Sequence, residues 1–198
     1  SYVNQPNAYS WYISRQSYNL MLMRQESSMR AVWDKVPRDF WRLESGDHEN
    51  LLIGLIRHGD AILDIVLELG RRRIQAGVPA LQYAKSVEIA RLMSEGFART
   101  KSIRGVARDW IDANPIYTLL AITPLAFGKE KKPRNYAEKT LAHLSQTQDH
   151  EALLDAAREH FDEDVVAALK DVLERDPLDL LPKKLPKLPT WLTPVSYT

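Results

Sequence analysis

The 198-residue chain contains no cysteine, and this absence excludes disulfides, thiolate zinc sites, iron–sulfur clusters and cysteine nucleophiles together. Because a reducing compartment suits such a composition, the sequence predicts a cytoplasmic protein. No apolar run approaches the roughly 20 residues that a membrane-spanning helix needs, and no signal segment opens the chain. The chain begins with Ser1 rather than Met, which we interpret as a piece of a longer protein.

Glycine is also scarce, at 8 residues, whereas good helix formers such as Leu, Ala, Glu and Arg abound. Apolar residues recur at helical spacing, for example over residues 103–111, 136–144 and 165–173. No stretch alternates apolar and polar residues for long. The sequence therefore predicts an all-α fold.

Capping residues, prolines and glycines divide this pattern into expected helices. Asp47 and Asp60 are placed as N-caps, and prolines at 79, 115 and 133 suit first turns. Glycines at 77, 96 and 128 suit helix ends, and Pro124 should kink or end its helix. The expected helices cover residues 8–30, 37–44, 48–58, 60–75, 79–95, 102–113, 115–127, 133–146, 149–160 and 163–175.

A short pattern recurs thirty residues apart, as Arg104-x-x-Ala107-x-x-x-Ile111 and Arg134-x-x-Ala137-x-x-x-Leu141, each with a helix after it. This period is typical of HEAT-like arrays, in which helix pairs stack because one pair cannot bury its apolar face alone. We expect one helical domain over residues 1–175, most HEAT-like over 78–175, with an irregular helical bundle as the alternative.

From Pro177 onwards, frequent prolines exclude a continuous helix and favour polyproline-like backbone. We expect residues 176–198 to form a Pro-rich extended tail or a linker to a following domain. Such a segment can occupy a groove that reads polyproline II, although a spacer is the commoner use of this composition.

Charge is segregated along the chain although its net value is only +1. Residues 71–134 contain thirteen Lys and Arg but only five Asp and Glu, whereas residues 138–181 contain four Lys and Arg and twelve Asp and Glu. A phosphate-binding surface is one interpretation of the basic part; a solvated helix face, or pairing with the acidic part, is the alternative. The candidate nucleic-acid or partner-binding residues are Arg71, Arg72, Arg73, Arg99, Lys101, Arg104 and Arg108.

The run Leu55-Ile56-Arg57-His58-Gly59 resembles the L-I-R-H-G signature of histidine phosphatases. That chemistry needs the histidine at the end of a core strand and a second histidine later in the fold. The preceding residues, however, have a helical pattern that begins after Asp47. We therefore expect Arg57-His58-Gly59 to end a helix, and a divergent phosphatase stays a remote alternative.

No other motif indicates chemistry. His58 and Asp60 lack further ligands at metal-binding spacing, and Asp162-Glu163-Asp164 is typical of a helix N-terminus. Phosphate-binding loops and nucleophile elbows are missing. The sequence therefore predicts a non-enzymatic protein with no catalytic residues, no metal site and no cofactor.

Aromatic residues crowd the N-terminus, at Tyr2, Tyr9, Trp11, Tyr12 and Tyr18 with Met21 and Met23 close by. A core-facing stripe is the favoured interpretation, with a partner-docking surface as the alternative. We expect Trp33, Trp41 and Trp110 to anchor the core.

Residues 104–192 resemble the helical region that precedes the large uncharacterised domain of bacterial MolR-type proteins. The resemblance depends on Asn114-Pro115, on the segment 124–129 (PLAFGK), on Asp176-Pro177-Leu178 and on the segment 185–192 (LPKLPTWL). These long cytoplasmic chains, named as molybdate-metabolism regulators, often carry a WGR domain, whose own signature is absent from this sequence. The resemblance implies an internal helical scaffold and brings no catalytic residues.

The sequence thus predicts a non-catalytic helical-repeat segment of a larger bacterial regulator, which makes protein–protein or interdomain contacts and no membrane contact. The alternative is a module that contacts nucleic acid through the basic stretch 71–134.

Overall fold

The computed structural model describes residues 26–35 and 47–175, and every regular element in these two ranges is a helix. The predicted all-α class is therefore confirmed for the described part of the chain. Predictions on the aromatic N-terminus, on the helix at 37–44, on Trp41 and on the Pro-rich tail lie outside the described residues.

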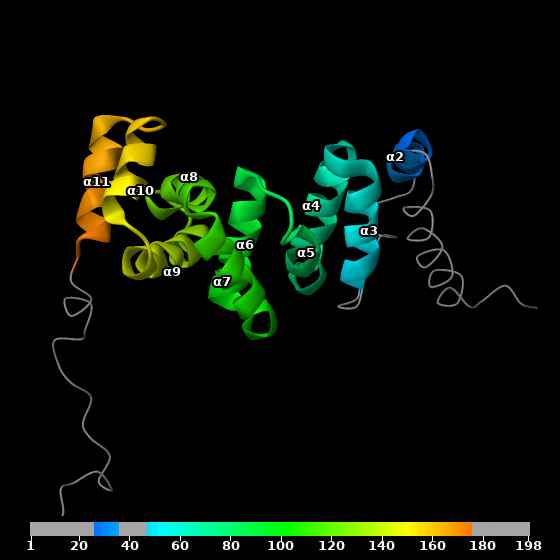
Figure 1. The fold of residues 1–198 in the computed structure, drawn as a ribbon, viewed down its shortest axis with the longest axis horizontal. Helices are drawn as coiled ribbons and strands as arrows, with labels where there is room; N and C mark the ends of the chain where they lie inside the picture. The colour runs from blue at the N-terminus through cyan, green and yellow to red at the C-terminus, as the bar shows by residue number, and fades with distance from the viewer. Residues whose placement is uncertain (1–25, 36–46, 176–198) are drawn as a thin grey trace, which may run out of the picture.

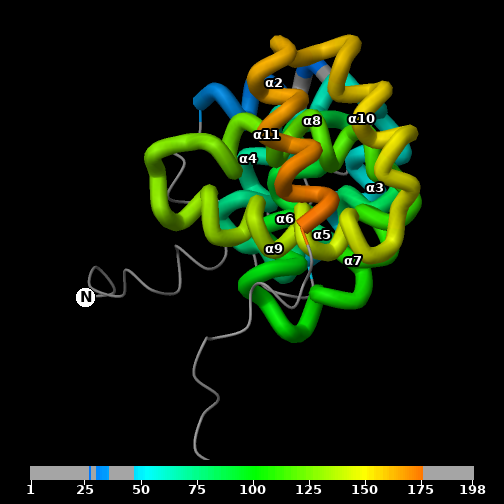
Figure 2. The backbone as a smooth tube through the Cα atoms, turned by 90° about the vertical axis from the view of Figure 1, so that its left-hand side faces the viewer, coloured from blue at the N-terminus to red at the C-terminus, as the bar shows by residue number. Residues whose placement is uncertain are grey.

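The helices follow one another along the long axis of the molecule in chain order, from α2 at one end to α11 at the other (Figure 1). Figure 2 looks along this axis from the α11 end, where the helices overlap in projection. The α-helices are α2 (Glu26–Lys35), α3 (His48–His58), α4 (Leu63–Arg72), α5 (Ile74–Leu81), α6 (Val87–Arg99), α7 (Arg104–Ala113), α8 (Pro115–Ala126), α9 (Lys131–Thr147), α10 (His150–Arg158) and α11 (Glu163–Leu173). Short 3₁₀ turns, η3 (Gly59–Ile62) and η4 (Lys101–Ile103), precede α4 and α7.

One hydrophobic core runs through the described array, from Trp33 on α2 to Leu173 on α11. Trp33 and Trp110 are buried, which confirms two of the predicted core anchors. The Trp110 indole Nε1–H also donates a hydrogen bond of 3.0 Å to the Ala84 carbonyl, so it fixes α7 to the loop between α5 and α6. Buried indoles usually find such an acceptor, because an unpaired N–H is costly inside a protein.

The region of α4 and α5 differs from its predicted boundaries. The segment expected as one helix over 60–75 is divided into η3 and α4, and Asp60 lies inside η3 rather than capping a helix. Gly77 and Pro79 lie inside α5 instead of ending one helix and starting the next. The chain turns after Leu81, and the Ser86 hydroxyl caps α6 by accepting a 3.1 Å hydrogen bond from the Ile89 N–H.

The physical reason for this difference is the close crossing of α4 and α5. A Cβ added at Gly77 would lie 2.3 Å from the Cα of Gly70, so both glycines are needed for backbone contact. Gly96 has a similar role inside α6, where it is buried against Val78 and Ile103 rather than ending the helix. Local sequence signals do not distinguish such packing glycines from helix ends.

Other boundaries agree with the predictions. Pro115 begins α8 and Pro133 lies in the first turn of α9, while α8 ends at Ala126, two residues after Pro124. Gly128 follows the end of α8, and α11 begins directly after Asp162. Asp47 precedes α3 as expected, although its side chain makes no capping hydrogen bond. The helix expected to end at residue 30 continues to Lys35.

The recurring pattern occupies α7 and α9, and its four apolar positions, Ala107, Ile111, Ala137 and Leu141, are all buried. Each of these helices packs most extensively on the helix before it, α7 on α6 and α9 on α8, whereas α7 and α8 touch only slightly. The pattern therefore marks the second helix of a packed pair, not the first as expected.

Candidate functional site

The seven predicted basic residues are all exposed and lie at two places on the described surface. Arg71 and Arg72 form the last turn of α4, and Arg73 connects α4 to α5. The other four, Arg99, Lys101, Arg104 and Arg108, follow one another over the corner where α6 turns into α7. At this corner the Arg104 Nε–H donates a 3.0 Å hydrogen bond to the Phe97 carbonyl near the end of α6.

The two basic groups lie at opposite ends of α6. Arg71 is close enough to Glu88, in the first turn of α6, to influence its pKa, whereas Arg99 ends the same helix. At a rise of about 1.5 Å per residue, this places the groups about 16 Å apart along the helix axis. The structure thus brings together four of the seven predicted residues and separates the remaining three from them.

Nearby carboxylates already neutralise several of these cations. Arg72 pairs with Glu68 at 2.8 Å, Arg99 pairs with Glu95, and Arg108 lies 3.3 Å from the Asp109 carboxylate. By contrast, Arg73 and Lys101 make no ion pair within residues 26–35 and 47–175. The positive charge of the predicted basic surface is therefore partly neutralised by acidic residues on the same helices.

The N-terminus of α6 holds a carboxylate that is stabilised in its charged form. Hydrogen bonds from the Glu88 backbone N–H and from the Ser86 hydroxyl hold the pKa of the Glu88 carboxyl below its usual range. The charges of Arg91 and Arg71 also lower this pKa. Acidic residues are favoured in the first turn of a helix, where free N–H groups and the macrodipole meet them.

A half-buried phenol connects α6 to α9. Burial raises the pKa of Tyr136 on α9, and the nearby Glu95 carboxylate on α6 raises it further. Arg91 and Arg99 act in the opposite direction. The outer face of α6 is therefore a row of alternating acids and bases beside Tyr136, rather than a uniformly basic surface.

Sequence reasoning missed a polar link between α7 and α9. The His143 Nε2–H donates a 2.7 Å hydrogen bond to the Asp112 carboxylate, and the His143 ring lies 5.0 Å from the Phe97 ring, measured between centroids. Gln148 also reaches the Asp112 carbonyl, at 3.5 Å. Asp112 and His143 are 31 residues apart and form no motif, so only the packing of the helices brings them together.

The L-I-R-H-G resemblance falls on a helix end. Arg57 and His58 close α3, and Gly59 follows with a φ of 56°, a left-handed conformation that favours glycine. The predicted helix end is therefore confirmed. The strand that the phosphatase signature requires before its histidine is replaced here by α3.

The described ranges contain no group of three or more His, Asp or Glu side chains arranged to hold a metal ion. Within the same ranges, no helix is long and apolar enough to cross a bilayer. Glu163 and Asp164 stand in the first turn of α11, where the helix dipole stabilises them.

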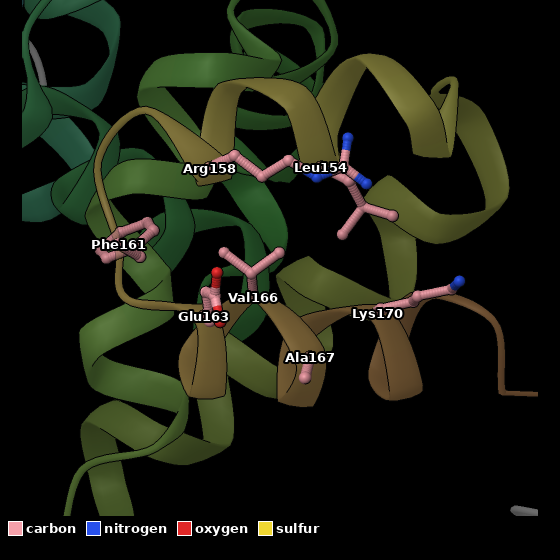
Figure 3. A pocket seen from close by; sticks show the side chains of 7 residues that line it. All are labelled: Leu154, Arg158, Phe161, Glu163, Val166, Ala167 and Lys170. Carbon is pink, nitrogen blue, oxygen red and sulfur yellow. The ribbon is translucent and has the colours of Figure 1, made fainter.

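A groove of about 410 Å³ lies between α10 and α11. Leu154 from α10 faces Val166 from α11 across it, and the Arg158 side chain runs along α10 towards Leu154 (Figure 3). Phe161 from the connecting turn closes one end, while Glu163, Ala167 and Lys170 complete the lining. Its lining thus combines apolar side chains with the charged groups of Arg158, Glu163 and Lys170.

Large apolar side chains are exposed at several points along the array. Ile56 on α3 is 74% exposed, and Tyr83, in the loop after α5, is 72% exposed. Ile53, Ile116, Tyr117 and Phe127 are exposed to a smaller degree. These residues lie at three places on the described array, on α3, in the loop after α5, and on α8 and its C-terminal end.

Comparison with known proteins gives one curated relative. The chain is 28% identical over 196 residues to the "Uncharacterized protein YehI" of Escherichia coli (strain K12), an alignment that covers 96% of this chain. The chain spans only 16% of the length of that relative. No protein-family model matches the sequence. No solved structure matches it either.

Proposed function

We propose that this chain is a non-catalytic, HEAT-like scaffold segment that makes protein–protein or interdomain contacts within a larger bacterial regulatory protein. The observation that carries the proposal is the linear order of the helix pairs, α6 with α7, α8 with α9 and α10 with α11 (Figure 1). Stacked pairs expose long surfaces to partners while each pair packs on its neighbours, which is the design of helical-repeat scaffolds.

The exposed apolar side chains support the same proposal. Ile56, Tyr83 and Tyr117 are spread over separate elements, as expected for a surface that contacts an extended partner or a neighbouring domain. Tyrosine is among the residue types that are enriched at the energetically dominant positions of protein interfaces.

The alignment with YehI supports membership of a larger protein, since it covers almost all of this chain and a small part of that relative. We propose the cytoplasm as its location, because the sequence has no cysteine. The resemblance of residues 104–192 to MolR-type regulators points to a regulatory role, with the protein partner or the neighbouring domain still to be identified.

Photo-crosslinking in cells tests the scaffold proposal. A photoreactive amino acid is placed at Ile56 or at Tyr117 in the full-length protein, with Asp171, an exposed polar position on α11, as the control. We expect the two apolar positions to form crosslinks to a defined partner or to another domain of the same protein. Crosslinking no stronger than at Asp171 would contradict the proposal.

A second candidate function is contact with nucleic acid through the basic stretch 71–134. It is favoured by Arg73 and Lys101, which make no ion pair with any described residue, and by Lys131 and Lys132 in the first turn of α9, where Glu130 at the N-cap is the adjacent acidic residue.

Fluorescence anisotropy of a labelled DNA duplex tests this second function at low and near-physiological salt. Binding that weakens steeply with salt, and that falls when Arg71, Arg72 and Arg73 are replaced by Ala, would support it. The matched control replaces Arg158, Lys170 and Arg175 by Ala, which removes the same charge outside the basic stretch. Absence of binding at low salt would contradict it.

A further inference from the structure

Helix α8 has an apolar character on all its sides, although only part of its surface is buried. Its sequence, PIYTLLAITPLA, contains no charged residue. Thr118, Leu119 and Ile122 are buried, and α8 packs on α6, α9 and α10 (Figure 1). A helix with apolar residues on every side is normally enclosed by other elements. The remaining face of α8 therefore lacks the cover that its composition predicts.

This uncovered face is a continuous stripe along the helix. Ile116, Tyr117 and Phe127 are 41–47% exposed, Pro124 is exposed and Leu120 is half-buried. At about 100° of rotation per residue, these five positions lie within about 100° of one another around the helix axis. An apolar stripe of this width usually faces a core, and a contiguous exposed one marks an interaction site. We call these five residues the α8 stripe.

Basic residues lie beyond the C-terminal end of the α8 stripe. Lys129, Lys131 and Lys132 are exposed and make no ion pair with any described residue. Glu130, at the N-cap of α9, is the acidic residue among them. Residues 129–132 therefore carry a net positive charge, which we call the basic end of the stripe.

Acidic residues lie at the N-terminal end of the α8 stripe. The Gln148 side chain reaches the Asp112 carbonyl, at 3.5 Å, so the start of α10 lies close to the start of α8. Asp149 and Glu151 are exposed there. Asp149 makes no ion pair with any described residue, and Glu151 makes a long one, of 3.9 Å, with Arg158. We call Asp149 and Glu151 the acidic end of the stripe.

The α8 stripe and its two ends are complementary to a second copy of themselves. If two stripes pack antiparallel about a two-fold axis, Tyr117 of one copy lies near Phe127 of the other, and Leu120 lies near Pro124. The basic end of each copy then meets the acidic end of the other. A two-fold interface requires such self-complementarity, because the same surface is used on both sides. Parallel stripes would instead place like charges together.

We propose that this chain forms a two-fold dimer through α8, with the α8 stripe of a second copy as the occupant and the two helices antiparallel. The 12 residues of α8 extend over about 18 Å at a rise of ~1.5 Å per residue. Contact along one such helix is smaller than a standard interface, so we expect a reversible dimer. The inference rests on the proposed scaffold function, since it names one partner for the exposed apolar surface.

Sedimentation equilibrium of the full chain over a range of concentrations tests the proposal. We expect a monomer–dimer equilibrium. Ile116→Glu/Phe127→Glu, which introduces charge into the stripe, should lower the association constant by about tenfold or more. The matched control is Ile53→Glu/Ile56→Glu, at two exposed apolar residues of α3, and should leave the association constant unchanged. Circular dichroism verifies that each variant keeps its helices.

Exchange of charges tests the antiparallel arrangement. Lys131→Glu/Lys132→Glu reverses the basic end, and Asp149→Ser/Glu151→Lys reverses the acidic end while keeping a capping oxygen at the start of α10. Each variant alone should dimerise more weakly than the unmodified chain, because the two ends no longer complement each other. An equimolar mixture of the two should recover dimerisation, since the altered ends match in the mixed dimer, and misfolded variants would show no such recovery.

Three results would overturn the proposal. They are a chain that stays monomeric at every concentration, dimerisation that survives Ile116→Glu/Phe127→Glu, and a mixture of the charge variants that fails to recover dimerisation. The scaffold function fails separately. Crosslinks from Ile56 or Tyr117 to a different protein or domain, in a chain that stays monomeric, would retain that function and exclude the second copy.

Discussion

The missing side chain of Gly77 sets the distance between α4 and α5. Its Cα faces the backbone of Gly70, and an added Cβ would lie 2.3 Å from the Gly70 Cα, a contact that no side-chain rotation relieves. Gly105 on α7 is the opposite case, because an added Cβ there meets nothing within 4 Å. Two glycines in helices therefore have opposite tolerance for the same substitution.

We expect Gly77→Ala to lower the free energy of unfolding by about 1–3 kcal/mol or more, because α4 and α5 must separate to admit the methyl group. Gly105→Ala is the matched control. It should leave stability unchanged or raise it by about 0.4–1 kcal/mol, since Ala restricts the unfolded chain. Urea denaturation followed by circular dichroism measures both, and equal effects of the two variants would contradict the steric argument.

Tyr136 makes stability depend on pH in alkaline solution. Burial raises its pKa in the folded state, so the neutral phenol is favoured there, and the native protein retains this proton where the unfolded chain has lost it. The resulting stabilisation is complete below the unfolded pKa of about 10 and is lost as pH rises through the folded pKa.

We expect Tyr136→Phe to reduce the loss of stability above about pH 10, because the variant has no phenol to ionise at this position. Unfolding by urea at pH values on both sides of this value measures the effect, and Tyr83→Phe, at an exposed tyrosine, is the control. An unchanged alkaline slope in Tyr136→Phe would show that Tyr136 is not responsible for it.

At the scale of helices, the ends of α6 show how a few polar groups define an element. Ser86 caps the first turn through the Ile89 N–H and also stabilises the Glu88 carboxylate, whose pKa is lowered as a result. Glu88 therefore contributes stability above its unfolded pKa, and this contribution is lost as pH falls through the lowered folded value.

We expect Ser86→Ala to destabilise the protein by about 1 kcal/mol and to raise the pKa of Glu88 towards its ordinary value. Both effects have the same cause, since one hydroxyl serves the Ile89 N–H and the Glu88 carboxylate. Ser102→Ala, at an exposed serine in η4, is the matched control and should change neither quantity. The Glu88 titration is followed by NMR, and a titration curve that does not move would refute the coupling.

Helix positions were largely predictable because apolar residues recur at helical spacing, and the buried faces of α7, α9 and α11 follow this spacing. Boundaries failed where tertiary packing decides, as at Gly77 and Gly96, which look like helix ends but serve as contact points. Of the candidate site, the sequence predicted only which Lys and Arg side chains are exposed, not the acidic side chains that pair with them. The carboxylates that pair with Arg72 and Arg99 are one helical turn away, whereas the link from Asp112 to His143 depends on the packing of distant segments.

At the scale of the whole molecule, contacts are concentrated between neighbouring helices, so stability should vary along the array. α3 packs on α5 near one end, and α11 packs on α9 and α10 at the other, without direct contact between the two regions (Figure 1). Local destabilisation should therefore remain local.

We expect Leu169→Ala, which removes a fully buried side chain of α11, to lower hydrogen-exchange protection in α10 and α11 by about 2–5 kcal/mol. Protection of α3 to α5 should change much less. Ile65→Ala on α4 is the reciprocal variant, with its main effect on α3 to α5. A uniform loss of protection along the chain in both variants would contradict this expectation and indicate all-or-none unfolding.

The chain order of the helix pairs also has a consequence for biosynthesis. Because α6 packs with α7 and α8 packs with α9, each pair finds most of its partners in residues that have already been synthesised or follow within a few turns. The nascent chain can therefore bury its apolar faces progressively while translation continues, at about 5–20 residues per second. Little of the apolar surface of an early helix pair therefore depends on much later residues for its burial.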